Sequence, residues 1–339
     1  MKAIIPCFTA MLAIGAATST ADAAVITVGA GGGYDFTTLA AAVGAAQAND
    51  DIRIAAGTYL NDFATVVIPL TIEGVGGPVV LQDTILIPNG KAILVIWADV
   101  TVRNITFSGA HVFDGNGAGI RAETGNLIVD GGTFLNNQDG ILSAGDPTAN
   151  ITVLNSTFIG NGAGDGFTHA IYAGAIDTQT VANSTFAGTL VGHDIKSRAH
   201  VTVITNNVLD DGVSGTPSYA IDIPNGGVAT ITGNTITQGV NTNNPAMIAY
   251  GAEGDIYAVS SLFIANNTFV NTLPHGSVGI FNHTADVLAV LQNNTFIGVE
   301  TPLRGPGGTP APAPEPATAS IFGLGLAGMA IRRRRAAVI

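Results

Sequence analysis

The sequence predicts an all-β chain folded as a single-stranded, right-handed parallel β-helix with a short N-terminal capping helix. Two observations lead to this fold class. A short Asn-x-Thr-Phe phrase recurs through the middle of the chain, and 44 glycines among the 339 residues interrupt its apolar runs every few positions. With 47% hydrophobic and 11% charged residues, the chain is too apolar to be disordered and too poor in charge to be a coiled coil. A stacked repeat of short strands is the architecture that fits.

Residues 1–23 are typical of a secretory signal peptide. Lys2 precedes an apolar run, and the segment ends in the small-residue cleavage pattern Ala21-Asp22-Ala23. The only cysteine, Cys7, lies inside this segment. After cleavage we therefore expect no disulfide and no cysteine-based metal site.

The predicted β-helix extends over residues 24–301. Its opening contains strands at 25–28, 51–54 and 70–74, and an Ala-rich amphipathic helix at 37–48. This succession resembles the opening of pectin-lyase-like β-helix proteins, including pectin methylesterases, in which a helix caps the first coil. The resemblance implies that the helix covers the N-terminal end of the core.

Two columns of apolar residues define the repeat. The recurring phrase ends in Phe or a related apolar residue at intervals of 23 to 33 residues. Five residues before each phrase end stands an apolar residue, and an isoleucine follows the phrase; inward-facing strand residues have this character. We therefore expect two short strands per repeat, separated by Gly/Asn-rich turns. The first column is Val102, Val129, Val153, Val181, Ile204, Ile231, Ile264 and Leu291, and the second is Ile120, Ile141, Ile171, Ile195, Ile221, Ile248 and Ile280.

Stacking buries what one repeat cannot bury alone. Coils stacked in parallel about 4.8 Å apart place like residues over like. Val, Ile and Phe would then stack inside, and Asn would form a ladder at the turns, where its side chain satisfies backbone groups and tolerates left-handed conformations. A β-sandwich is the alternative, but it gives no reason for the same residue at the same position of successive repeats.

The C-terminal residues are typical of a sorting signal. Residues 302–316 form a Pro-rich linker, and residues 317–339 contain an apolar segment followed by the cluster Arg332 to Arg335. The order Pro314-Glu315-Pro316, apolar segment, Arg cluster resembles the PEP-CTERM signal of Gram-negative bacteria. The resemblance implies export to the cell surface or extracellular matrix and processing by an exosortase-type enzyme near Pro314-Glu315-Pro316. The apolar segment would reach only about 22 Å as a helix, short of a hydrocarbon core of about 30 Å, so we expect only transient membrane association.

Removing both signals changes the net charge. The whole chain carries −12, whereas residues 24–316 contain seven basic and 23 acidic residues and carry about −16. So acidic a body is not expected to bind nucleic acid. Its seven basic residues are the only cations available for an anionic partner.

One segment, residues 192–198, departs from the repeat because it contains two of those seven basic residues. If Ile195 points inward, alternation turns Asp194, Lys196 and Arg198 outward on one face. Lys and Arg on such a face suit the carboxylates of an acidic sugar.

Aligning neighbouring coils on their inward isoleucines extends this face. The alignment places Tyr172 and Asp222 in the column of Lys196 and brings Glu253 nearby. We therefore expect a site for an acidic polysaccharide or exopolysaccharide. The candidate catalytic residues are Lys196, Arg198 and Asp222, and the candidate substrate-binding residues are Tyr172, His193, Asp194, Tyr250 and Glu253.

Two enzyme families of the same fold resemble parts of this chain. Lys196-Ser197 before an Asn-Asn coil resembles alginate-lyase-like enzymes, in which a Lys abstracts the C5 proton while Ca²⁺ or an Arg neutralises the uronate carboxylate. This resemblance implies β-elimination with Lys196 as the base and leaves a Ca²⁺ cofactor open, without a defined site; Asp222 stands where those enzymes carry a second cation. Gln138-Asp139 resembles the Gln-Asp step of pectin methylesterases, but their paired downstream aspartate motif and Gly-Arg-Pro-Trp segment have no counterpart, so that activity is not expected.

Three functions remain open from the sequence. The chain either binds, and by β-elimination cleaves, an acidic polysaccharide, or it is a non-catalytic structural or adhesive protein of the matrix or biofilm. In the second case, Lys196 and Asp222 form only a surface ion pair. Ice binding is not favoured, because the threonines form one line rather than a flat array. The threonine file is Thr106, Thr133, Thr157, Thr185, Thr235, Thr268 and Thr295, and the histidines expected at turns or on the surface, outside any metal site, are His111, His169, His200, His275 and His283.

Overall fold

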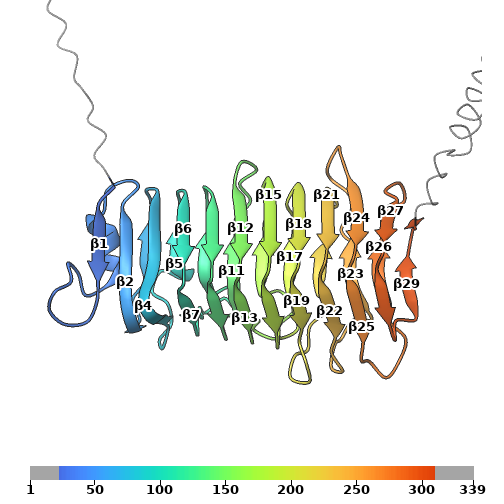
Figure 1. Cartoon of the computed structure of the whole chain (residues 1–339), viewed down its shortest axis with the longest axis horizontal. Coiled ribbons are helices and arrows are strands. Elements are labelled where there is room, and N and C mark those ends of the chain that lie inside the picture. Colours follow the sequence, from blue (N-terminus) through green and yellow to red (C-terminus); the bar gives the residue numbers. More distant parts are fainter. Residues whose placement is uncertain (1–22, 310–339) are drawn as a thin grey trace, which may run out of the picture.

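The computed structural model describes residues 23–309, which form a right-handed parallel β-solenoid. Figure 1 shows the strands stacked side by side along the long axis, from β1 at one end to β29 at the other. The predicted fold class is confirmed. Residues 1–22 of the predicted signal peptide, and the predicted sorting signal from residue 310 onward, lie outside the described residues.

The first coils contain the only helix of the described residues. The chain runs through β1 (Val25–Val28), α1 (Leu39–Ala45), β2 (Asp51–Leu60), β3 (Ala64–Val66), β4 (Leu70–Gln82) and β5 (Ala92–Ile96). Strands were expected at the starts of β1, β2 and β4, and the structure confirms all three.

The one helix in residues 23–309, α1, is too short to cross a membrane.

Each later coil contributes three strands. The first strands are β6 (Val100–Arg103), β9 (Leu127–Asp130), β12 (Asn150–Leu154), β15 (Thr178–Ala182), β18 (Val201–Thr205), β21 (Val228–Thr232), β24 (Ser261–Ala265) and β27 (Ala289–Gln292). The second strands are β7 (Thr106–Ser108), β10 (Thr133–Leu135), β13 (Thr157–Ile159), β16 (Thr185–Ala187), β19 (Val208–Asp210), β22 (Thr235–Gln238), β25 (Thr268–Asn271) and β28 (Thr295–Ile297). The third strands are β8 (Ala118–Ala122), β11 (Asp139–Ser143), β14 (Ile171–Ala173), β17 (Ile195–Ser197), β20 (Ile221–Ile223), β23 (Ala246–Tyr250), β26 (Val278–Asn282) and β29 (Thr301–Arg304).

The strands form two sheets. One sheet of 20 strands contains the first and second strands, and a sheet of ten strands contains the third strands together with β3 and β5. The expectation of two strands per repeat was wrong, because the Thr-Phe step is itself a short strand. The asparagine before it turns the chain in the left-handed region, for example Asn104 at φ 55° and Asn183 at φ 53°.

Both predicted apolar columns are confirmed. Val153 pairs with Val181 and Val181 with Ile204, while Ile171 pairs with Ile195 and Ile195 with Ile221. All of these side chains are completely buried, Val153 included. Coil-to-coil pairing therefore places like over like throughout the core.

A stack of phenylalanine rings runs through the same core. Ring centroids are 4.7 Å apart between Phe134 and Phe158, and again between Phe158 and Phe186, with nearly parallel planes. The threonine beside each ring lies in the same register, but Val208 interrupts this outer file. The threonines therefore form a single interrupted line.

The predicted asparagine ladder lies at the corner between the first and second strands. Asn207 donates from its backbone N and its Nδ2 to Asn234 Oδ1, at 2.8 and 3.0 Å. Asn234 makes the same two bonds to Asn267, and Asn267 to Asn294. Buried backbone groups at this corner are thus satisfied by side chains of the next coil.

The two ends of the solenoid differ from the prediction in extent. The capping helix is shorter than expected, with Thr38 as its N-cap, and two of its first backbone N–H groups donate to the Asp62 carboxylate.

At the C-terminal end of the solenoid, β29 pairs with β26, and β30 (Gly307–Gly308) pairs with β27. The expected start of the linker at residue 302 was therefore wrong, because a further turn of backbone pairing continues to Gly308.

We predict that Asn234→Ala lowers the free energy of unfolding by about 2 kcal/mol or more. The substitution leaves the Asn207 N–H without its acceptor and the Ile204 carbonyl without a donor in a buried setting. Urea denaturation followed by circular dichroism would measure the change at constant m-value. Thr235 directly follows Asn234 and is exposed. The control Thr235→Ala should therefore change the free energy of unfolding by no more than about 0.5 kcal/mol. Equal losses for the two variants would contradict the ladder's role.

Candidate functional site

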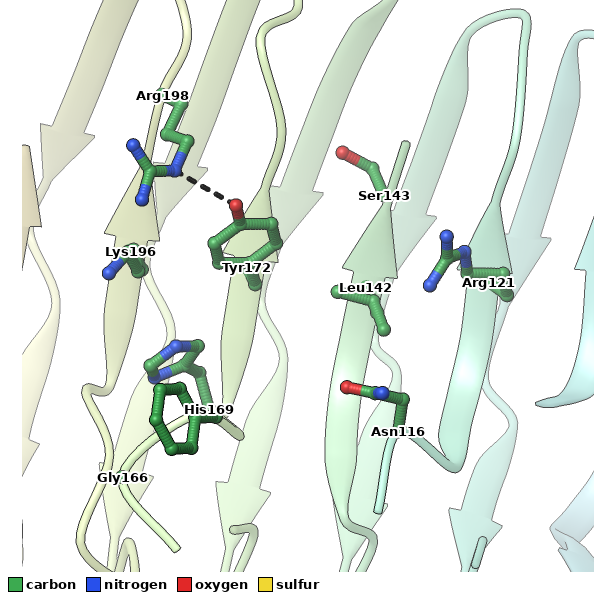
Figure 2. Close-up of a pocket in the computed structure, with 10 residues that line it drawn as sticks. Asn116, Arg121, Leu142, Ser143, Gly166, His169, Tyr172, Lys196 and Arg198 are labelled. Carbon is green, nitrogen blue, oxygen red and sulfur yellow. Dashed lines mark hydrogen bonds between the residues drawn. The ribbon is translucent and has the colours of Figure 1, made fainter. Parts of the chain in front are cut away.

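A groove of about 340 Å³ lies on the outer face of the ten-stranded sheet. Consecutive third strands place one outward residue each in its central column, which runs Arg121, Leu142, Tyr172 and Lys196 and continues beyond the groove to Asp222. Figure 2 shows Arg121 on one side of the groove and Lys196 with Arg198 on the other, with Leu142 and Tyr172 between them. The groove is thus a cationic–aromatic–cationic strip across four coils.

Arg198 forms a fixed end of the groove. Its Nε donates to the Tyr172 hydroxyl at 2.9 Å, and its Nη1 donates to Asn225 Oδ1. Its guanidinium also pairs with the Glu253 carboxylate, with an Nη1–Oε2 distance of 2.7 Å. The hydrogen bond from Arg198 is the main cause that lowers the pKa of Glu253. The predicted neighbourhood of Tyr172, Arg198 and Glu253 is therefore present.

Lys196 lies between two carboxylates. Its Nζ is 3.2 Å from Asp222 Oδ2 and 3.5 Å from Glu253 Oε1. Asp222 is only 3% exposed, and burial raises its pKa, an effect that the Lys196 ammonium partly offsets. The Lys196–Asp222 ion pair is therefore largely covered, whereas one alternative from the sequence placed it on the surface; the alignment of coils does not show that its neighbours bury Asp222.

A stack of aromatic rings lies beside Lys196. The His169 and His193 rings are 4.8 Å apart, and the Tyr219 ring continues the stack 5.4 Å beyond His193. Backbone N–H groups donate to Nδ1 of both histidines, and Nε2 of His193 lies 3.4 Å from Asp222 Oδ2. His169 was expected at a turn or on the surface; it lies in the turn segment before β14, but it is buried there, with only 2% of it exposed.

Both stacked histidines are neutral at ordinary pH. Burial, followed by the charges of His193 and Lys196, lowers the pKa of His169 to about 2. Burial, followed by the Lys196 charge, lowers the pKa of His193 to about 3. Groups with such low pKa values accept protons only weakly, so the stack offers hydrogen bonds rather than a strong base.

Arg121 supplies the opposite end of the groove and was missed by sequence reasoning. Its Nε lies 3.5 Å from Glu123 Oε1, which already pairs with Lys91 Nζ at 2.7 Å. This buried Nε has no hydrogen-bond partner among residues 23–309. The sequence does contain a pattern that identifies Arg121. Arg121 comes directly after the inward residue Ile120, just as Lys196 comes directly after the inward residue Ile195.

Two predicted site residues point into the interior instead. Asp194 is completely buried, and its Oδ1 accepts a hydrogen bond from Thr189 Oγ1 at 2.6 Å. Tyr250 is also completely buried, and its hydroxyl donates to the Gly227 carbonyl at 2.6 Å. The expectation that Asp194 faces outward was wrong, because strict alternation fails at the turn that precedes β17.

Another buried acid, Asp139, lies at the start of β11. Its Oδ1 accepts a hydrogen bond from the His169 backbone N at 2.8 Å, and its Oδ2 has no partner. Burial raises the pKa of Asp139 to about 8, although the His169 N–H lowers it in part. Within residues 23–309, no group of three or more His, Cys, Asp or Glu side chains is arranged to bind a metal ion.

The solenoid with its outer-face groove defines the class: a right-handed β-helix protein. Residues 91–269 match the family described as right handed beta helix region, and the chain belongs to this family. Residues 312–335 match the PEP-CTERM protein-sorting motif, which indicates export to the surface or exterior of a bacterial cell. A search of curated proteins finds no match.

The chain is similar to two solved structures at low sequence identity. One is the PL6 family alginate lyase AlyGC, with 16% identity, a TM-score of 0.54 and coverage of 81% of this chain. The chain spans only 39% of that enzyme's length. Another is the pectin methylesterase from carrot, with 15% identity, a TM-score of 0.44, and coverage of 86% of this chain and 90% of that enzyme.

We predict that Asp139→Asn makes the protein more stable at pH 8 than the unsubstituted chain, by at least about 1 kcal/mol. The folded protein retains the Asp139 proton up to about pH 8, whereas the unfolded chain releases it near the ordinary aspartate pKa of 3.8. The contribution of Asp139 to the free energy of unfolding is therefore fully present below about pH 4 and is lost as the pH rises through 8. Asparagine keeps the acceptor for the His169 N–H and removes the charge.

Urea denaturation at pH 4, 6 and 8 would measure this difference. The gap between the variant and the unsubstituted chain should widen as the pH rises. Asp286→Asn, at an exposed position, should leave the pH dependence unchanged. A constant gap for Asp139→Asn would show that the carboxyl is not protonated in the folded state.

Proposed function

We propose that the protein is exported to the exterior of a Gram-negative bacterium and binds an acidic polysaccharide in the groove between Arg121 and Arg198. One observation carries the proposal. Of the seven basic residues in the described part of the chain, three line this one groove, on a body with a net charge of about −16. Cations gathered against the net charge of a protein favour a local anionic ligand.

The shape of the groove favours a polymer with charges along its length. Arg121 and Lys196 stand three coils apart, which corresponds to about 14 Å at the spacing of parallel strands. Leu142 and Tyr172 cover the distance between them with an apolar and an aromatic surface, on which the faces of sugar rings can lie. The alginate lyase of similar fold supports this ligand class through its fold alone.

The site favours binding over cleavage. Lys196, the base that β-elimination would need, already pairs with Asp222 and Glu253 through its Nζ. The neighbouring histidines are neutral but are weak bases, because burial lowers the pKa of His169 to about 2 and of His193 to about 3. The groove therefore offers charged and aromatic contacts that favour the binding of a polymer.

We predict that Arg121→Gln and Arg198→Gln each weaken the binding of an oligouronate about tenfold or more. Each change removes a charge-assisted hydrogen bond to a sugar carboxylate. A glycan array with and without Ca²⁺ would first select the oligouronate, and isothermal titration calorimetry would then give the dissociation constants. Absorbance of unsaturated products would report any cleavage in the same samples.

Arg103→Gln is the matched control, because Arg103 is exposed on β6 in the other sheet. Its affinity for the oligouronate should equal that of the unsubstituted protein. Equal losses for all three variants would mean that binding follows net charge alone. A neutral dextran bound as tightly as the oligouronate would also contradict the proposal.

We further predict that the exported form lacks Arg332 to Arg335. The PEP-CTERM motif at residues 312–335 implies processing by an exosortase-type enzyme near Pro314-Glu315-Pro316. Intact mass spectrometry of the protein recovered from the cell exterior would measure the C-terminus. Retention of the four arginines would contradict this processing.

A further inference from the structure

Two phenylalanine side chains stand out as the most exposed large apolar residues of the described chain. Phe113 is 96% exposed and Phe167 is 81% exposed. Other phenylalanines of the repeat, such as Phe134 and Phe158, are fully buried in the core stack. Exposed rings that lie together mark a binding surface more often than scattered ones do.

Phe167 is held outward by an ordered turn. Asp165 Oδ1 accepts hydrogen bonds from the Phe167 N at 2.8 Å, the Thr168 N at 3.1 Å and the Thr168 Oγ1 at 2.9 Å. Thr168 Oγ1 in turn accepts from the Ala163 N. Because the backbone is already fixed, a ligand that covers the ring pays little conformational entropy for ordering it.

The turn that carries Phe113 is fixed in the same way and lies against the first. Gln138 Oε1 accepts from the Val112 N at 2.8 Å and from the Gly117 N at 2.7 Å, on either side of Phe113. A Cβ at Gly115 would lie 3.5 Å from Asp165 Oδ2. The two turns therefore adjoin at one edge of the solenoid.

This edge is continuous with the cationic groove. Phe167 and Asn116, one from each turn, line the groove together with Arg121, Lys196 and Arg198. Figure 2 shows Asn116, Gly166 and His169 along one edge of the groove, below the column of Leu142, Tyr172 and Lys196. A ligand whose carboxylates reach the cations is therefore within reach of the Phe167 ring.

We infer that Phe167, with Phe113 on the adjoining turn, is a stacking platform for a pyranose ring of the bound polymer. One face of a pyranose presents C–H groups, which bury apolar area against an aromatic ring. The platform makes the site selective for an acidic sugar polymer over a polyanion without rings. The inference rests on the proposed function, since it adds a ring contact to the same groove.

Phe167→Ala should weaken oligouronate binding about tenfold, because it removes most of the apolar area that the sugar covers. Phe167→Trp should restore the affinity, and Phe113→Ala should weaken it severalfold. Binding of polyglutamate, which carries carboxylates but no rings, should be the same for Phe167→Ala and the unsubstituted protein. Val213→Ala, at a residue that is 78% exposed in the turn before β20, is the matched control and should bind the oligouronate normally.

The outcomes separate the two proposals. If Phe167→Ala binds the oligouronate like Val213→Ala while Arg121→Gln and Arg198→Gln bind weakly, the platform is wrong and the groove stands. If the arginine variants also bind normally, the proposed function itself fails. Sedimentation velocity of the same variants tests a second copy as the occupant: a dimer that Phe167→Ala converts to a monomer would overturn the sugar platform.

Discussion

The parallel hydrogen bonding of each coil to the next is the constraint on which the rest of the structure depends. It fixes the coil spacing at about 4.8 Å and leaves no freedom of register, so a residue at one position lies directly over its counterpart in the next coil. Val153 over Val181 and Asn234 over Asn267 follow from this rule. The same rule builds the groove, because Tyr172 and Lys196 are one column of adjacent coils.

Such stacking also limits where charge can stand. Like charges on adjacent coils would repel at close range, and the column of the groove avoids this arrangement. Arg121 is followed by Leu142 and Tyr172 before the next cation, Lys196, and Lys196 is followed by Asp222. The spacing of cations in the groove is therefore a consequence of the fold as well as a feature that a ligand can recognise.

The predictable part of this protein is the part that repeats. The inward columns, the asparagine ladder and the neighbourhood of Tyr172, Lys196 and Asp222 all follow from aligning one coil on the next. The alignment fails where the chain leaves the strands. Asp194 stands at a turn, where alternation no longer decides which way a side chain points, and it is buried against Thr189. The exposure of Phe167 depends on a turn of irregular length, which no repeat pattern encodes.

Rigid strands and irregular turns thus contribute different properties to one surface. The strands hold Arg121 and Lys196 at a spacing that side-chain motion changes little, because each lies in a paired sheet column. The turns bring Asn116 and Phe167 to the edge of that column, where insertions are tolerated without loss of the core. A β-helix can therefore keep its charge spacing while the turns change the shape of the groove, so under the proposed function the strands set the class of ligand and the turns its identity.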